Sequence, residues 1–181
     1  TDVAKLLNEL KAEKVDGVVV DLRENGGGSL DEAVDLTGLF IDRGPVVQVR
    51  QSGGYTQIRS DEDRGVLWNG PLAVLVNRSS ASASEIFAAA IQDYGRGLII
   101  GEPTFGKGTV QGLLPLPPER GEAGGKYGTA KITSQQFFRI DGGTTQNAAV
   151  TPDLQFPVTV DATEFGESTY DNALPFTRIE A

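Results

Sequence analysis

The hydrophobic positions of this 181-residue chain form short apolar runs that alternate with stretches of helical spacing. Residues 17–22 (GVVVDL) are largely β-branched, which is typical of a buried strand. In residues 3–14 the apolar side chains recur at intervals of three and four, the spacing of one helix face. This alternation predicts an α/β fold with a mixed, largely parallel sheet and flanking helices. We expect strands at 17–22, 71–76, 98–100 and 131–140, and helices at 3–14, 29–41 and from Ser82 or Ser84 to about Tyr94.

Turn-forming residues divide the rest of the chain. Residues 46–50 and 55–59 alternate around Ser52-Gly53-Gly54, which indicates a β-hairpin, and 141–143 (DGG) indicate a turn. Three prolines at 115, 117 and 118 and a Gly-rich stretch at 121–128 indicate an irregular connection or insertion. We find no internal repeats, and we expect one core over residues 1–158 and a solvated acidic tail or linker over residues 159–181.

The composition excludes several kinds of chemistry. The chain contains no His and no Cys, which excludes Ser-His-Asp hydrolases, thiol proteases, disulfides and zinc sites with His or Cys ligands. It also contains no Met, so we expect an excised or processed piece of a longer protein. The net charge of −9 argues against a nucleic-acid partner, whose phosphates need a positive surface. No apolar run is long enough to span a bilayer.

Three loops, 23–28, 77–82 and 101–108, follow three of the predicted buried strands. In open α/β sheets, functional sites are built at the carboxyl ends of the strands. The second loop delivers Ser82 to a helix N-terminus, where Ser82 could attack a carbonyl and the Ala83 amide could bind the oxyanion. The alternative is structural, because Ser82 and Glu85 have the spacing of a capping box and a lone Ser there is far more often an N-cap.

The first and third loops carry further candidates. Three consecutive glycines, 26–28, permit close backbone approach and could supply a second oxyanion donor, or they form a tight turn only. Lys107 lies between two glycines and next to Phe105. Partial desolvation there would lower its pKa and leave an amine able to accept a hydroxyl proton, with Gln111 orienting it. Otherwise Lys107 is an ordinary surface lysine.

The third loop also matches the GxxxxGK pattern of phosphate-binding P-loops, from Gly101 to Lys107. The match is physically poor. Pro103 has no amide to offer a phosphate, and a P-loop must open a helix, whereas residues 110–118 are β-branched and then interrupted by proline. A P-loop nucleotide-binding protein therefore remains a remote alternative.

Three longer strings resemble the C-terminal processing, or tail-specific, peptidases (peptidase family S41). They are VVVDLRENGGGSLDEAVDLTGLFIDRGPVVQV, VNRSSASASEIFAAAIQDYGRGLIIGEPTFGKGTVQ and GGTTQNAAVTPD. The resemblance implies Ser82 as nucleophile, Lys107 as base and Gln111 as the residue that orients the lysine. It also associates Asp93 with function, although a structural role is at least as well supported, and it implies oxyanion donors at Ala83 and at Gly28 or Gly27.

For the whole chain, the resemblance implies a fold related to crotonase and Clp protease, with residues 1–158 as the catalytic core. It implies a serine endopeptidase with a Ser-Lys dyad that needs no cofactor or metal and cleaves proteins with apolar C-terminal tails in the periplasm. A PDZ domain is expected in the full-length protein, and nothing in this chain resembles one. The alternative in another functional class is a non-catalytic peptide- or ligand-binding module of the same fold.

Overall fold

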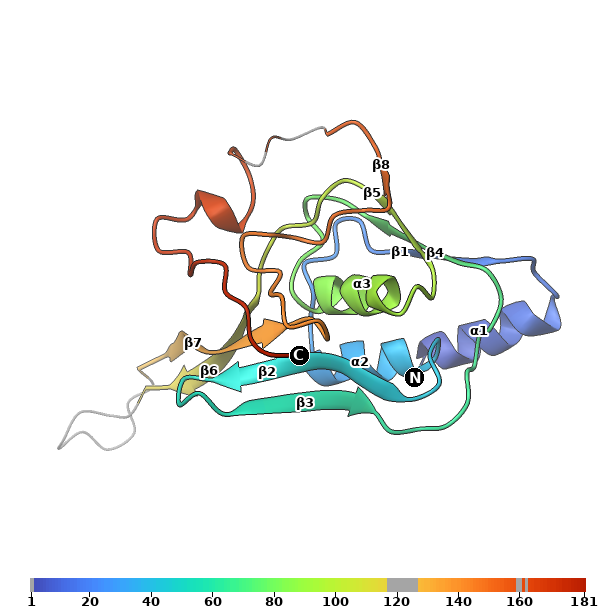
Figure 1. Ribbon diagram of the computed structural model, residues 1–181, viewed down its shortest axis with the longest axis horizontal. Helices are drawn as coiled ribbons and strands as arrows, with labels where there is room; N and C mark the ends of the chain where they lie inside the picture. Colours follow the sequence, from blue (N-terminus) through green and yellow to red (C-terminus); the bar gives the residue numbers. More distant parts are fainter. Residues whose placement is uncertain (1, 117–126, 159–160, 162) are drawn as a thin grey trace.

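The computed structural model describes residues 2–116, 127–158, 161 and 163–181. It contains two four-stranded sheets with helices between them (Figure 1). The described elements are α1 (Asp2–Ala12), β1 (Val18–Asp21), α2 (Leu30–Gly38), β2 (Gly44–Gln51), β3 (Thr56–Asp61), β4 (Leu72–Val76), α3 (Ala83–Asp93), β5 (Leu98–Gly101), β6 (Thr109–Pro115), β7 (Thr129–Phe138), β8 (Leu154–Gln155) and the 3-10 turn η1 (Glu167–Thr169).

The first sheet is parallel, with strand order β1-β4-β5-β8. Its central strands lie in register, so that Val20 pairs with Val74 and Val74 with Ile99. Because the strands are parallel, the loops after β1, β4 and β5 all emerge at the same edge. This arrangement confirms the predicted α/β class with a parallel sheet.

The second sheet is antiparallel, with strand order β3-β2-β7-β6. The predicted hairpin at 46–59 is confirmed as β2 and β3, and the predicted strand at 131–140 as β7. The sequence did not indicate that these strands leave the parallel sheet. It also did not indicate β6 as a strand, because prolines follow its apolar residues. In the described part of the chain β6 pairs with β7 alone, and Leu113 and Leu114 on it are exposed. Most of the connection expected at 115–128 lies outside the described residues.

Helix α3 is the centre of the molecule (Figure 1). Phe87, Ala88 and Ile91 pack into the apolar core beneath the parallel sheet, whereas Ile86 and Ala90 pack into a second core with β2 and α2. A helix with apolar side chains on all faces is expected to be buried in this way. The N-terminus of α3 is therefore held between both sheets, and Ser82 immediately precedes it.

The segment at 163–181 returns to the core and is not simply a solvated tail. Ile179 N donates to Gly142 O at 2.9 Å, and Asn147 Nδ2 donates to Leu174 O at 3.0 Å. The Phe165 ring contacts the Phe105 ring, with centroids 5.4 Å apart. Apolar and main-chain groups between the acidic side chains thus bind the core, while most residues of the segment are exposed, and the acidic tail or linker expected at 159–181 stays a prediction. The domain boundary expected near residue 158 stays a prediction.

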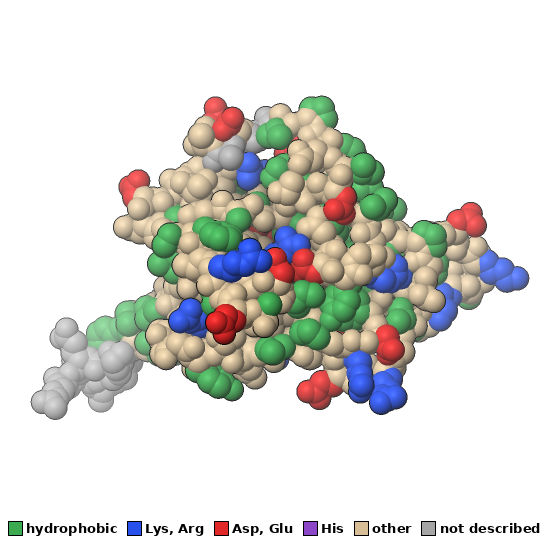
Figure 2. Space-filling view, viewed as in Figure 1, with side chains coloured by type: hydrophobic (Ala, Val, Ile, Leu, Met, Phe, Trp, Pro, Cys, Tyr) green, Lys and Arg blue, Asp and Glu red, His purple; other side chains and the backbone are tan. Residues whose placement is uncertain are grey.

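β8 is an edge strand of the parallel sheet, and apolar side chains gather over it in the space-filling view (Figure 2). Leu154 is 53% exposed and Phe156 52%.

Among the helices that the structure describes, none is long and apolar enough to cross a membrane.

Candidate active site

Hydrogen bonds join the three loops that follow β1, β4 and β5. Ala81 N donates to Asn25 O at 3.0 Å, and Ser80 Oγ donates to Leu22 O at 2.7 Å, which connects the first loop to the second. Phe105 N donates to Ser80 O at 2.9 Å, which connects the second loop to the third. The loops expected to form a site therefore do meet at one edge of the sheet.

Ser82 lies at the N-cap of α3 with φ 57° and ψ −113°. A positive φ is uncommon for a residue with a side chain and costs about 1–3 kcal/mol, so it persists only where the surroundings impose it. Here the Ser82 N–H donates to Glu85 Oε2 at 2.8 Å, which is one half of the predicted capping box. The structural role of Ser82 as N-cap is thus present, and its strained backbone sets the direction of its side chain.

Glu85 is fully buried and connects the second and third loops. Its Oε1 accepts from Thr104 Oγ1 at 2.6 Å and Gly106 N at 2.8 Å. Its Oε2 accepts from Ser82 N and, at 2.9 Å, from Lys107 N. Burial raises the pKa of Glu85 to about 7, although all four hydrogen bonds favour the ionised form and lower it. The sequence showed Glu85 only as half of a cap.

Gly27 is packed against the Ser82 turn. It has φ +96°, and a Cβ on it would lie 2.5 Å from Ala81 O and 2.9 Å from Ala83 N, so the position requires glycine. The Gly27 amide already donates to Asn25 Oδ1 at 3.0 Å. Within the described part of the chain, the amides of Gly28 and Ala83 have no partner. Of the two glycines considered as oxyanion donors, Gly28 is therefore the one with an available N–H.

Lys107 is half-buried, and its Nζ donates to Thr109 O at 3.4 Å. Burial is the largest cause that lowers the pKa of Lys107 below its usual value, and the nearby Lys131 lowers it further. Glu167 and Glu85 act in the opposite direction. The environment thus shifts the equilibrium toward the neutral amine relative to a solvated lysine, which is the direction required of a lysine that acts as a base.

One cavity of about 330 Å³ brings most of the candidate residues together. Ser82 and Lys107 both line it, but among the described residues no hydrogen bond joins their side chains. Its wall includes the apolar side chains of Leu30, Ile86, Val110 and Phe137. The other candidates that line it are Ala83, Gly27, Gly28 and Gln111.

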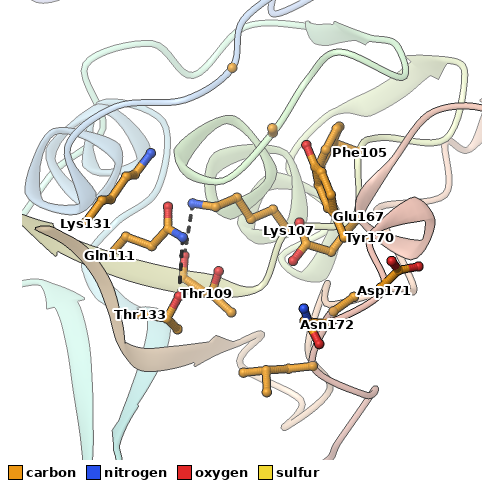
Figure 3. A pocket seen from close by; sticks show the side chains of 14 residues that line it. Phe105, Lys107, Thr109, Gln111, Lys131, Thr133, Glu167, Tyr170, Asp171 and Asn172 are labelled. Carbon is orange, nitrogen blue, oxygen red and sulfur yellow. Dashed lines mark hydrogen bonds between the residues drawn. The ribbon is translucent and has the colours of Figure 1, made fainter.

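Gln111 lies on β6 and lines this cavity, and the Lys107 side chain extends toward it (Figure 3). Gln111 Nε2 donates to Thr133 Oγ1 at 3.3 Å, across the β6–β7 pair. The structure therefore places Gln111 beside the lysine, bound to Thr133. Its expected role in orienting the amine stays a prediction.

Asp93 is not brought to the cavity. It is the last residue of α3, eleven residues long, and so lies about 15 Å from the Ser82 end. Both its carboxylate oxygens accept from Arg139 Nε, at 3.1 and 3.2 Å, and the Arg139 guanidinium also binds Gln92. This geometry supports the structural alternative, in which Asp93 attaches the end of α3 to the segment after β7.

The loop from Gly101 to Lys107 does not have the geometry of a P-loop. It leads into β6 and not into a helix. In addition, the amides of Gly106 and Lys107 donate to Glu85, so they are not available to a phosphate. The nucleotide-binding alternative is therefore wrong. In the part of the chain that the structure describes, no group of three or more acidic side chains could hold a metal ion.

A second cavity, of about 790 Å³, adjoins the first at Lys107 and Gln111 (Figure 3). Part of its wall comes from the segment after β8, through Glu167, Tyr170 and Leu174. The sequence does not indicate this wall, because acidic and polar residues in a C-terminal segment are typical of a solvated surface and not of a cavity.

Residues 1–156 match the family model described as peptidase family S41. The chain is 51% identical to the tail-specific protease of Haemophilus influenzae, over 98% of this chain and 26% of that protein. It is 37% identical to the carboxy-terminal-processing protease of Bartonella bacilliformis, over 84% of this chain and 33% of that protein. Among solved structures, it is similar to the photosystem II D1 C-terminal processing protease, with a TM-score of 0.73 and 36% identity over 85% of this chain and 38% of the other. The chain thus spans between about a quarter and two fifths of the length of these relatives.

Proposed function

The chain belongs to peptidase family S41, and on this premise we propose that it carries the catalytic residues of a serine endopeptidase with a Ser82–Lys107 dyad. The observation that carries the proposal is the common support of the two residues. Their backbone amides bind the same oxygen of Glu85, and their side chains line the same cavity. Two chain segments that are far apart in the sequence are thereby held in fixed relation, as an acyl-transfer site requires.

In the proposed mechanism, neutral Lys107 takes the proton of the Ser82 hydroxyl as Ser82 Oγ attacks the peptide carbonyl. The amides of Ala83 and Gly28 bind the resulting oxyanion, because both are free and Ala83 adds the positive end of the α3 dipole. Lys107 then gives its proton to the leaving amine, which departs and leaves an acyl-enzyme on Ser82. A water molecule, deprotonated by Lys107, hydrolyses this ester and restores both residues.

In the proposed mechanism the Lys107 amine presents its lone pair to the Ser82 hydroxyl. Its N–H donates to Thr109 O at 3.4 Å, which is long for a hydrogen bond. A neutral amine can keep such a bond while its lone pair accepts a proton, so this contact is compatible with the role of a base. Gln111 lies beside the amine and is the side chain available to orient it.

The walls of the smaller cavity suggest what the site accepts. Leu30, Ile86, Val110 and Phe137 present an apolar surface beside Ser82. An apolar side chain next to the scissile bond would be transferred from water to this surface, which is favourable. The same cavity is lined by Lys107 and Lys131, so a cationic side chain there would lose its hydration without gaining a partner of opposite charge.

The natural substrates follow from the relatives and are part of the proposal. The names of the relatives describe tail-specific and carboxy-terminal-processing proteases. We extend this to protein substrates with apolar, poorly structured C-terminal tails, captured by a PDZ domain elsewhere in a longer polypeptide, and to a periplasmic location.

The test is cleavage of an unstructured protein with an apolar C-terminal tail. Wild type, Ser82→Ala and Lys107→Ala are compared, with Ser52→Ala and Lys5→Ala as controls on exposed residues away from the cavity. We expect both dyad variants to lose about 10³-fold or more in kcat, and the controls to keep wild-type rates. Equal cleavage by all five proteins would exclude the dyad.

The same set of variants is measured in a longer polypeptide that includes this chain. If only the longer polypeptide cleaves, with the same losses in the two dyad variants, the residues are right and the chain needs further parts. If neither form cleaves but both bind the tail, and Ser82→Ala binds equally well, the chain is a binding module.

A further inference from the structure

Lys107 lies between two walls that carry opposite charges (Figure 3). On one side, β6 and β7 present Gln111, Thr133 and Lys131. On the other side, the segment after β8 presents Glu167. Lys131 lines both cavities that Lys107 lines, and Glu167 lines the larger one.

Glu167 is fixed beside the Lys107 loop by two sets of hydrogen bonds. Its N–H donates to Phe105 O at 3.0 Å. Its carboxylate accepts from Gln146 Nε2 at 2.9 Å, and Gln146 Oε1 accepts from Gly108 N at 2.8 Å. Because the Gln146 side chain is completely buried, this connection is rigid. The carboxylate is thus tied to the residue that follows Lys107.

Lys131 is held less firmly. It is exposed on β7, and its strand pairs with β6 through Gln111 and Thr133. Its position is therefore set by the sheet, while its ammonium remains in contact with solvent. The charge of Lys131 acts on Lys107 partly through solvent, where dissolved ions screen it, so we expect its effect to depend on the salt concentration.

Two other acidic groups belong to the surroundings of Lys107. Glu85 lies on α3, and its carboxylate accepts hydrogen bonds from four donors, one of which is Lys107 N. Asp171 follows η1 and lines the larger cavity. A nearby ammonium makes protonation of Lys107 less favourable, and a nearby carboxylate makes it more favourable. Burial is the largest cause that lowers the pKa of Lys107, Lys131 lowers it further, and Glu167 and Glu85 raise it, in accord with this arrangement.

We propose that Lys131 and Glu167 are opposed positioning residues that act through Lys107 and adjust, in addition to its burial, how much of it is uncharged in the resting site. The inference rests on the proposed function for its consequence, since only the uncharged amine accepts the Ser82 proton. Lys131 favours this resting form, and Glu167 stabilises the ammonium that forms during the attack.

Glu167 lies beyond residues 1–156, the part of the chain that matches the family model. The relative from Haemophilus influenzae is aligned over 98% of this chain, whereas the relative from Bartonella bacilliformis is aligned over 84%. One of the two opposing charges is therefore supplied from outside the family core.

The experiment is the pH dependence of kcat/KM for wild type, Lys131→Gln and Glu167→Gln. The acid limb of this profile reports the pKa of the base in the free enzyme. Lys131→Gln should move the limb to higher pH and Glu167→Gln to lower pH, each by about half a unit, or roughly threefold in rate on the limb. Gln at position 167 can still accept from Gln146, so the fold is kept.

The controls separate charge from shape. Lys131→Arg should leave the limb in place, because it keeps the charge, and so should Glu164→Gln on the same segment and Lys5→Gln on α1. The shift in Lys131→Gln should decrease in 0.5 M NaCl, where the screening length is a few ångströms. Shifts of both Gln variants in the same direction, or none in either, would overturn the proposal.

A second measurement keeps this proposal separate from the proposed function. The pH-dependent rate at which acetic anhydride acylates Lys107, quantified by mass spectrometry of the peptide that contains it, follows the free amine directly. Opposite shifts in this rate without any Ser82-dependent cleavage would support the charge pair and contradict the peptidase. Cleavage that requires Ser82 and Lys107, with an unshifted rate in both variants, would contradict the charge pair alone.

Discussion

The backbone amides of Ser82 and Lys107 donate to one and the same oxygen, Oε2 of Glu85, at 2.8 and 2.9 Å. Ser82 precedes α3 and Lys107 precedes β6, and Glu85 is the third residue of α3. A single buried carboxylate therefore sets the relative position of the two residues proposed as nucleophile and base. Among the described residues, no hydrogen bond joins this carboxylate to either side chain.

Replacing this carboxylate tests its importance. In Glu85→Gln, one acceptor oxygen becomes an NH2 group that faces N–H donors, so buried donors lose their partners. Each such loss costs about 1–3 kcal/mol. We expect the free energy of unfolding, measured with urea, to fall accordingly, and kcat/KM to fall about tenfold or more under conditions where the variant is folded. Glu32→Gln, at the matching position of the exposed first turn of α2, should change neither; equal behaviour of the two variants would contradict this role.

Glu85 should also make stability depend on pH. Its pKa in the folded protein is raised from 4.5 to about 7, chiefly by burial. Between these values the folded state holds a proton that the unfolded state releases, so this group's contribution is full below pH 4.5 and is lost as pH rises through about 7. Urea unfolding from pH 4.5 to 8 should show the stability of wild type decreasing relative to that of Glu85→Gln. An unchanged difference between the two proteins would contradict the raised pKa.

Gly27 should not tolerate a side chain. Gly27→Ala places a Cβ 2.5 Å from Ala81 O at a φ of +96°, and both effects strain the turn next to Ser82. We expect a loss of about 2–4 kcal/mol in the free energy of unfolding. Gly26→Ala is the matched control, because no atom lies within 4 Å of a Cβ there. A loss of less than about 1 kcal/mol in Gly27→Ala would show that the turn can relax.

Asp93 should matter for stability and not for the chemical step. In Asp93→Asn, Arg139 loses its charged partner in a largely covered ion pair, with side chains 21% and 12% exposed. We expect a loss of about 1–3 kcal/mol in the free energy of unfolding and less than a threefold change in kcat for the folded enzyme. A fall of about 10³-fold in kcat, as for the dyad variants, would instead make Asp93 part of the catalytic machinery.

Several features of the site could be predicted from sequence because they depend on local pattern. The apolar runs at 17–22, 71–76 and 98–100 indicated buried parallel strands, and parallel strands end at one edge. The strands are parallel but not buried on both faces, since Val19 is 61% and Leu98 52% exposed. It followed that the loops with Gly28, Ser82 and Lys107 would meet, which the structure confirms through one cavity. The roles of these residues in catalysis stay predictions.

Other features depend on contacts between distant segments, for which the sequence has no local signal. A Glu three residues after a Ser indicates a cap, and only the folded chain brings Gly106 and Lys107 to the same carboxylate. By contrast, the separation of Asp93 from Ser82 follows from the helix predicted between them, and only the partner of Asp93, Arg139, depends on the folded chain.

The sequence by itself determined the α/β class, the order of the buried strands and helices along the chain, and the residue types left for catalysis once His and Cys were absent. These follow from the periodicity of side chains along one segment and from composition. The tertiary structure decided how the strands divide into two sheets and which carboxylate binds the amides of Ser82 and Lys107. It also decided that Glu167 lines the same cavity as Lys107. These depend on which distant surfaces exclude water together and which buried donors find acceptors, and that is settled only when the whole chain packs.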